Sequence, residues 1–217
     1  WARALDCLGQ GPTIVSGGEL QLIFGINFTG TSLSLAGGTL RGGIGGSPSY
    51  AGLVSLAADA QINVDGGSSL TFSNASGISG AAFNLTKGGG GTLVLPGANN
   101  TWASLPVSAG TVALNGTSGA GPISVLTGAT LSGAGTIGGS VDVQADATLA
   151  PGASIGTLNI GGNLTLAKNH VAAGTSSGRT RWYATGSVGV GASRSDTWNG
   201  PPIPVASRVR APSTAGA

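Results

Sequence analysis

The sequence predicts an all-β solenoid, a parallel β-helix that is followed by an irregular C-terminal tail. Its 217 residues include 42 glycines, and 40% are hydrophobic while only 7% are charged. Disordered chains need low hydrophobicity and high charge, so this composition excludes disorder over most of the length. Glycine or proline interrupts nearly every window of about twelve residues, which excludes long helices. Short apolar strands recur about every twenty residues, a spacing typical of repeat proteins.

The recurrence begins at Thr13, where short runs of alternating apolar residues start to follow turns rich in glycine. Subtracting positions gives the intervals Leu20 to Leu40, 20; Leu40 to Ile62, 22; Ile62 to Leu93, 31; Val112 to Leu131, 19; and Leu131 to Leu149, 18. The interval of 31 contains a further strand-like phrase, Ser69–Phe72, and then the small-residue run 76–82. We interpret this longer interval as an inserted loop or an enlarged turn.

The residue pattern selects the type of solenoid. A leucine-rich repeat needs Leu-x-x-Leu-x-Leu-x-x-Asn, which the chain lacks, whereas alternating Val, Leu and Ile between Gly and Asn turns favour a parallel β-helix. Each turn then contributes two or three short strands. Because neighbouring strands lie about 4.8 Å apart, roughly eight turns over residues 13–167 predict a rod on the order of 40 Å long.

The strand pattern divides the chain into three regions, and the charge separates the last of them from the other two. Residues 1–12 form an irregular lead-in, residues 13–167 form the β-helix, and residues 168–217 form a basic tail outside the pattern. Residues 1–167 hold three basic and six acidic side chains, a net of −3, and residues 168–217 hold six basic and one acidic, a net of +5. The tail is either disordered or translated out of the parent reading frame from near residue 168. The total of +2 is too small to predict a nucleic-acid partner.

The ends and the cysteine content limit the class of protein. Cys7 is the single cysteine, so the sequence predicts no disulfide framework and no cysteine-rich metal site. The chain starts at Trp1 and contains no methionine, which indicates a fragment or a processed piece. No apolar run of about eighteen residues occurs, so the sequence predicts no transmembrane segment in this fragment.

A motif in the middle of the chain resembles a known family. The phrases Leu85–Gly88, Gly91–Leu95 and Gly97–Asn99, followed by Val107–Val112, are similar to the autotransporter-associated β-strand repeat of bacterial passenger domains. Further matching phrases lie at 128–139 and 147–158, so the resemblance is good over residues 78–167 and loose over 13–77. Two departures are Trp102, where the family prefers tyrosine, and Ser104-Leu105-Pro106 in place of Gly-Gly-Thr.

The resemblance implies a fold, a location and a partner. It implies a right-handed β-helix that is secreted or displayed on the surface of a Gram-negative cell. Anchoring at the outer membrane would come from the passenger's own C-terminal barrel, which the sequence indicates is encoded outside this chain. Adhesive contacts with host surfaces or polysaccharides are further partners that the resemblance suggests.

Three glycine-rich motifs resemble parts of catalytic or cofactor sites. Gly152–Gly156 fits the Gly-x-Ser-x-Gly nucleophile elbow at Ser154, but a strand-like phrase follows it where that fold needs a helix. The fold also needs an acid and then a histidine after the serine. Here the only histidine, His170, precedes Asp196, the only acid after Ser154. Gly133–Gly138 fits Gly-x-Gly-x-x-Gly without the helix that a dinucleotide needs. The run Gly88–Gly91 lacks the Gly-Lys-Ser/Thr ending of a phosphate loop. We therefore predict no catalytic serine and no cofactor.

Acidic residues offer the remaining route to catalysis. Polysaccharide lyases and hydrolases also use β-helices, and glycoside hydrolysis needs paired carboxylates about 5–9 Å apart. The closest pairs within the repeats are Asp142 with Asp146 and Asp59 with Asp65, and we interpret both pairs as separate solvated acids. One histidine, one cysteine and no acidic repeat predict no metal site.

Other residues favour structural roles. Trp102 is expected to pack over the rod or a corner, with an exposed binding aromatic as the alternative. Arg179, Arg181 and Trp182 fit an acidic partner and a disordered tail equally well. Asparagines at turn corners explain the Asn-x-Ser/Thr sequons, with glycosylation as the alternative; these sequons start at Asn27, Asn74, Asn84, Asn99, Asn115 and Asn163.

These observations together predict an autotransporter passenger scaffold, a structural or adhesive stalk without catalysis of its own. A β-helical polysaccharide lyase or hydrolase and a glycine-rich surface-layer protein are the alternatives.

Overall fold

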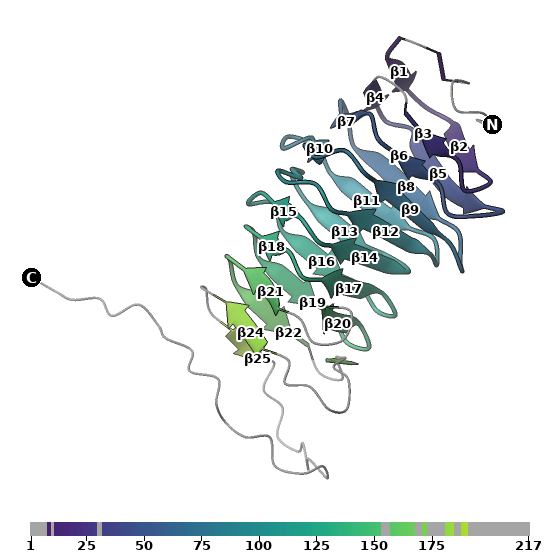
Figure 1. Cartoon of the computed structure of the whole chain (residues 1–217). Coiled ribbons are helices and arrows are strands. Elements are labelled where there is room, and N and C mark those ends of the chain that lie inside the picture. Colours follow the sequence, from purple (N-terminus) through teal and green to yellow (C-terminus); the bar gives the residue numbers. More distant parts are fainter. Residues whose placement is uncertain are drawn as a thin grey trace, which may run out of the picture.

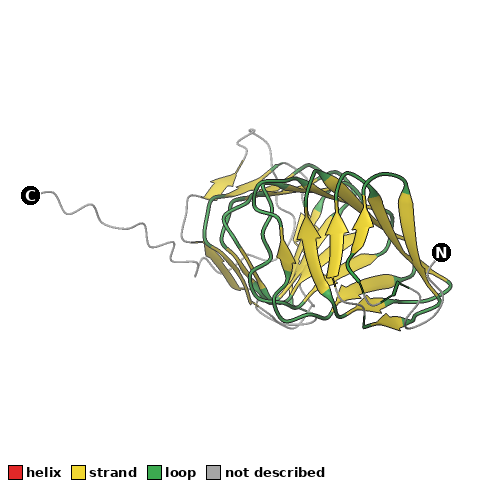
Figure 2. Ribbon diagram, turned by 90° about the horizontal axis from the view of Figure 1, so that it is seen from above, coloured by secondary structure: helices red, strands yellow, loops and turns green. Residues whose placement is uncertain are grey.

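The chain folds as a parallel β-solenoid. The computed structural model describes residues 8–9, 11–29, 32–152 and 157–167, together with the backbone of three strands at 171–172, 181–184 and 188–190. All strand pairs in these residues are parallel, and no helix occurs among them. Figure 1 shows the strands stacked turn upon turn as a rod, and Figure 2 shows the strand walls around its interior. The predicted all-β parallel β-helix is therefore confirmed.

Two walls run the length of the rod. Sheet A contains β2 (Glu19–Ile23), β5 (Thr39–Ile44), β8 (Ala60–Val64), β11 (Leu85–Gly88), β13 (Leu105–Val107), β16 (Ile123–Val125), β19 (Val141–Val143), β22 (Leu164–Leu166) and β25 (Val188–Val190). Sheet B contains β3 (Asn27–Phe28), β6 (Ser49–Tyr50), β9 (Ser69–Phe72), β12 (Thr92–Leu95), β14 (Thr111–Leu114), β17 (Thr130–Gly133), β20 (Thr148–Pro151) and β23 (Val171–Ala172). From β2 to β22 the chain makes about seven turns, slightly fewer than expected.

The third wall changes sheets midway. Its first four turns form sheet C, with β1 (Thr13–Val15), β4 (Ser32–Leu35), β7 (Leu53–Leu56) and β10 (Ile78–Ser79). Its later turns form sheet D, with β15 (Thr117–Ser118), β18 (Thr136–Ile137), β21 (Thr157–Ile160) and β24 (Arg181–Ala184). In the fifth turn an isolated bridge between Asn100 and Ser118 stands in place of a strand. Three strands per turn are thus the rule in the described part of the rod, and the fifth turn departs from it.

The long interval between Ile62 and Leu93 has a different main cause from the inserted loop that we expected. Ile62 lies in sheet A, opposite Leu40, whereas Leu93 lies in sheet B, opposite Leu70. The turn itself is measured within one sheet, from Leu70 to Leu93, and this interval is close to those of the other turns. The rest of the long interval is the step from one wall to the next. The turn is therefore only slightly longer than its neighbours.

Stacked apolar columns fill the rod. In sheet B, the inward residues Leu70, Leu93, Val112, Leu131 and Leu149 lie opposite one another in successive turns and are at most 1% exposed. A second column begins with Phe28, Tyr50 and Phe72, and the last two rings pack edge to face at 6.5 Å. Because each strand alternates inward and outward residues, the outer faces carry the polar side chains.

Glycine is required where turns approach most closely. Gly97, Gly116 and Gly135 form a column at the corner between sheet B and the third wall. A Cβ at Gly116 would lie 1.9 Å from the Gly97 oxygen, and a Cβ at Gly135 would lie 2.1 Å from the Gly116 oxygen. No side chain fits there, which explains part of the glycine content.

The tail is described only in part. Strands β23, β24 and β25 pair with β20, β21 and β22, so these segments continue sheets B, D and A. The rest of residues 168–217, and residues 1–7 and 10 of the lead-in, lie outside the described residues.

Candidate functional site on the outer face of sheet A

The glycine motifs lie in the corners of the solenoid. Gly88 ends β11, and Gly89 takes a left-handed backbone with φ 71° where the chain leaves sheet A. Gly133–Gly138 runs from the last residue of β17 through β18, and a further strand, β19, follows it in place of a helix. Neither segment has the strand-to-helix geometry that a phosphate or dinucleotide site needs. Ser154, His170 and Asp196 lie outside the described residues.

The acidic pairs are divided between different parts of the rod. Asp59 precedes β8 and Asp65 follows it, so these two carboxylates lie at opposite ends of a strand about 16 Å long. Asp142 points outward from β19, whereas Asp146 has a left-handed backbone with φ 59° in the following corner. Among the residues that the structure describes, no three His, Cys, Asp or Glu side chains lie together as metal ligands would.

Asp59 links two turns. Its carboxylate accepts hydrogen bonds from the Asn84 backbone N–H at 2.8 Å and from the Asn84 side-chain amide at 2.9 Å. These bonds stabilise the charged form and hold the pKa of Asp59 below its usual value. Asn84 in turn accepts a hydrogen bond from the Ser104 hydroxyl at 2.7 Å. Asp59 therefore begins a polar column across three turns.

Trp102 packs as a structural residue. Its side chain is only 3% exposed, and its indole N–H donates to the Gly121 oxygen of the next turn at 3.3 Å. The expectation that it packs over the rod is confirmed, and the alternative of an exposed binding aromatic is wrong. The side chains of Arg179, Arg181 and Trp182 lie outside the described residues.

The sequon asparagines fall into three classes of exposure. Asn27, Asn99, Asn115 and Asn163 are exposed, Asn84 is half-buried and Asn74 is buried. Asn99 takes a left-handed backbone with φ 65°, which suits the predicted corner role. Glycosylation at the exposed positions stays a prediction.

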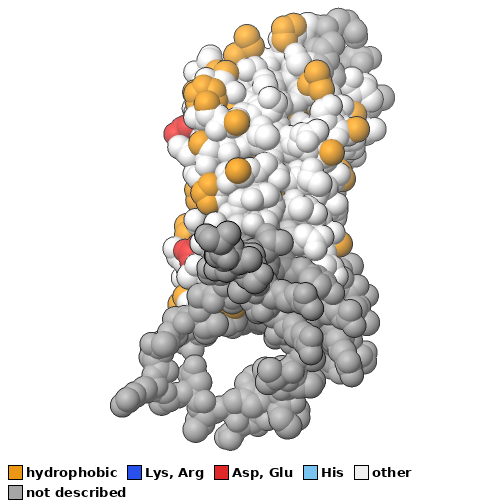
Figure 3. All heavy atoms as spheres, turned by 90° about the vertical axis from the view of Figure 1, so that its left-hand side faces the viewer, with side chains coloured by type: hydrophobic (Ala, Val, Ile, Leu, Met, Phe, Trp, Pro, Cys, Tyr) orange, Lys and Arg blue, Asp and Glu red, His pale blue; other side chains and the backbone are white. Residues whose placement is uncertain are grey.

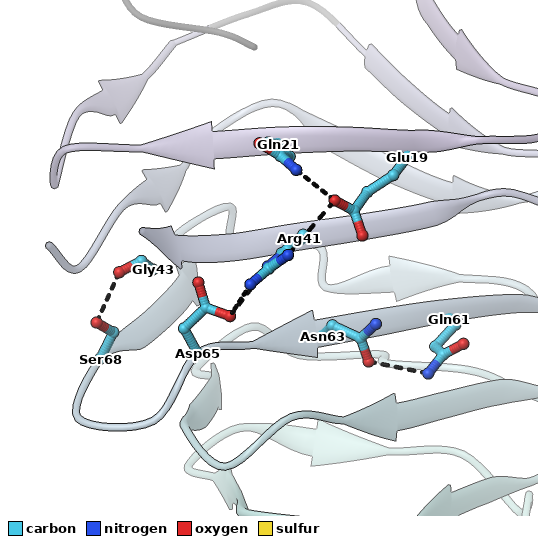
Figure 4. A network of polar contacts seen from close by, with 8 residues as sticks. All are labelled: Glu19, Gln21, Arg41, Gly43, Gln61, Asn63, Asp65 and Ser68. Carbon is cyan, nitrogen blue, oxygen red and sulfur yellow. Dashed lines mark hydrogen bonds and ion pairs between the residues drawn. The ribbon is translucent and has the colours of Figure 1, made fainter. Parts of the chain in front are cut away.

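A polar network covers the outer face of sheet A in its first three turns (Figure 4). We call it the polar strip and define it as Glu19, Gln21, Arg41, Gln61, Asn63 and Asp65. The strand register places Arg41 between Gln21 and Asn63 on neighbouring strands. It is the part of the described surface where long polar side chains gather.

Arg41 is the centre of the polar strip. Its guanidinium Nη2 lies 2.9 Å from Asp65 Oδ1, to which Nε also donates at 3.0 Å, and its Nη1 lies 3.8 Å from Glu19 Oε1. The hydrogen bond to Asp65 raises the pKa of Arg41. Gln21 donates to Glu19, and Gln61 donates to Asn63 Oδ1 at 2.9 Å. These contacts hold the planar groups in place across three turns.

Later turns lack these side chains. The outward row that passes through Gln61 and Thr86 continues as Pro106, Ser124, Asp142 and Thr165. A different face, shown in Figure 3, is mostly uncharged, with hydrophobic side chains scattered along it. The strip is therefore a local feature of the N-terminal turns.

A buried lysine is the other unusual polar group. Lys87 is fully buried in a column of inward residues of sheet A, between Ile62 and Val107. Its ammonium donates to the oxygens of Gly88, Gly89 and Ala109 at 2.8, 2.9 and 3.0 Å. Burial lowers the pKa of Lys87 to about 8. All three hydrogen bonds go to backbone oxygens of the solenoid, so Lys87 links the corners of two neighbouring turns. We assign it a structural role.

Reasoning from the sequence missed both features. The strip was detectable, because Glu19, Arg41 and Asp65 follow one another at intervals close to one turn each. Lys87 gave no such signal, since a lone lysine usually lies at the surface.

Comparisons of this chain with known protein families, with curated proteins and with solved structures find no match. In the part of the chain that is described, no helix is long and apolar enough to cross a membrane.

Proposed function

We propose that this chain is part of an autotransporter passenger, a structural or adhesive stalk displayed at the surface of a Gram-negative cell. The observation that supports it most is the continuity of sheets A and B, whose parallel strands pair from the first turn to the last. Backbone pairing of this kind makes a stiff rod that needs only contacts between neighbouring turns. Such a rod holds distal parts of a protein away from a membrane.

The side chains support a scaffold over an enzyme. The polar groups of the third wall and of the corners mainly bond neighbouring turns, as in the column Asp59, Asn84 and Ser104. Among the described acidic side chains, Glu19 and Asp65 both lie beside Arg41, whose guanidinium pairs with them. The others are spread over different strands and corners of the rod. The polar strip gathers side chains that donate and accept hydrogen bonds on one outer face, which suits adhesion.

Display on cells tests this proposal. The chain, carrying an N-terminal export signal and an epitope, would be joined at its C-terminus to an outer-membrane barrel in a Gram-negative host. We expect antibody to label the epitope on intact cells and added protease to remove the label. An intracellular epitope, or release of sugar products from polysaccharides by the purified chain, contradicts the proposal.

A further inference from the structure

An exposed aromatic residue occupies a corner where other turns use glycine. Phe24 follows β2 and is 55% exposed, with a left-handed φ of 61° that bulky residues rarely adopt. At the same corner, from sheet A to sheet B, glycines take the left-handed backbone in turns two to six, namely Gly45, Gly67, Gly89, Gly110 and Gly128. The backbone of Phe24 is therefore strained, while more than half of the residue is exposed.

The corner of Phe24 adjoins the polar strip. Phe24 donates its backbone N–H to Ile44 at 2.9 Å, and Asp65 donates its own to Gly42 of the same strand, β5, at 3.0 Å. The ring lies against Gly45, where an added Cβ would come within 2.9 Å of it. The polar strip measures about 10 Å across its three neighbouring strands and about 16 Å along β2.

The chemistry of this surface selects its ligand. Planar amide, carboxylate and guanidinium groups, fixed at neighbouring positions, present both donors and acceptors, as vicinal hydroxyl groups require. The exposed ring of Phe24, at the adjoining corner, offers an apolar face to the C–H groups of a sugar ring. We propose that the polar strip and Phe24 bind a short neutral oligosaccharide, an inference that rests on the adhesive role proposed above.

Charge argues for a neutral ligand. Glu19 and Asp65 contribute −2 and Arg41 contributes +1, so the strip has a formal net charge of −1. Arg41 already lies beside both carboxylates and presents no isolated positive charge. Sulfated or uronic acid chains would be repelled, and nucleic acid likewise.

The decisive variant is Phe24→Gly in the full chain. Glycine suits the left-handed backbone, so the melting temperature is expected to stay equal or rise while binding to the oligosaccharide falls about tenfold. Binding would be measured on an array of neutral hexose and N-acetylhexosamine oligomers, beside sulfated and uronic acid chains. Asn63→Ala, in the centre of the strip, is expected to weaken binding similarly, whereas Ser124→Ala, outward in turn six, leaves it unchanged.

Several results would overturn the inference. They are the absence of binding to any neutral oligomer, preference for the acidic chains, and Phe24→Gly and Asn63→Ala variants that bind like the parent chain. Self-association that Phe24→Gly abolishes, seen by light scattering, would assign the surface to a second copy instead. Surface display of the epitope uses no glycan, so an intact display with no glycan binding refutes this inference and leaves the stalk proposal standing.

Discussion

Lys87 occupies an inward position that aliphatic residues fill in the neighbouring turns of sheet A. Its ammonium is surrounded by backbone oxygens, with no carboxylate among its hydrogen-bond partners. An unpaired buried cation is unfavourable, and burial accordingly lowers the pKa of Lys87 from 10.5 to about 8. The three hydrogen bonds make the position tolerable, so a residue that looks like a surface charge in the sequence becomes a link between two corners.

The pH dependence of stability should reveal this burial. Between pH 8 and pH 10.5 the unfolded chain keeps a proton on Lys87 that the folded chain has released. The contribution of Lys87 to stability therefore rises with pH through this window and is constant below it. We expect the free energy of unfolding, measured by urea titration from about pH 7 to about pH 9.5, to rise more in the parent chain than in Lys87→Met.

Ending the titration at about pH 9.5 keeps the ionisation of Tyr50 out of the measured range, because burial raises the pKa of that phenol. Parallel curves for the two proteins would show that Lys87 is not buried as described. The matched control is Arg41→Met. The half-buried guanidinium that it removes does not titrate in this range, so the slope should be unchanged.

At the scale of a strand, a single side chain replaces a missing element. Asn100 is fully buried in the fifth turn, where its Oδ1 accepts from the Ile78 N–H at 3.1 Å and its Nδ2 donates to Thr117 O at 2.9 Å and Gly97 O at 2.7 Å. It thus joins the last strand of sheet C to the first strand of sheet D. The third wall stays connected although its backbone pairing is interrupted.

Replacing Asn100 should break this connection. Asn100→Leu keeps a similar volume but leaves the buried Ile78 N–H without its side-chain acceptor. It also removes one of the two donors to each of Thr117 O and Gly97 O, which keep backbone N–H partners. We therefore expect a loss of about 1–3 kcal/mol in unfolding free energy. Asn27→Ala, at an exposed sequon asparagine, is the control and should cost less than about 0.5 kcal/mol. Urea unfolding measures both, and equal losses would contradict a special role for Asn100.

A corner glycine gives a second test at this scale. Gly116→Ala places a methyl group 1.9 Å from the Gly97 oxygen, a backbone atom that cannot rotate away. We expect a loss of at least about 2 kcal/mol. Gly66→Ala is the matched control, because nothing lies within 4 Å of its added Cβ and its backbone is not left-handed. Thermal and urea unfolding should separate the two variants clearly.

The strands of four to six residues in sheets A and B were predictable from sequence, because each is a short alternating run after a turn. Their assignment to one sheet or the other was not, since Leu40 and Leu93 follow the same Gly-Gly-Thr phrase in different walls. The very short strands β10, β15 and β18 carry too few residues to show a period. The change of the third wall depends on the Asn100 side chain, which no pattern of hydrophobicity records.

At the scale of the whole molecule, the strand register makes each turn an exchangeable unit. Thr111 and Thr130 occupy the same position on β14 and β17, one above the other. The third wall repeats in the same way, because Thr117 and Ser118 of β15 lie opposite Thr136 and Ile137 of β18. Removing one full turn therefore brings equivalent residues into the contacts of those that were lost.

Deleting residues 111–129 should shorten the rod without unfolding it. The deletion removes one full turn and joins Gly110 to Thr130, which lie in neighbouring turns with Thr130 N–H donating to Gly110 O at 2.8 Å. Since stability is a sum over neighbouring turns, we expect the circular dichroism of a β-protein and a cooperative transition at slightly lower temperature. Deleting residues 111–120, about half a turn, places sheet B strands against the wrong wall and should abolish the transition. Equal loss of structure in both variants would show that the turns are not equivalent units.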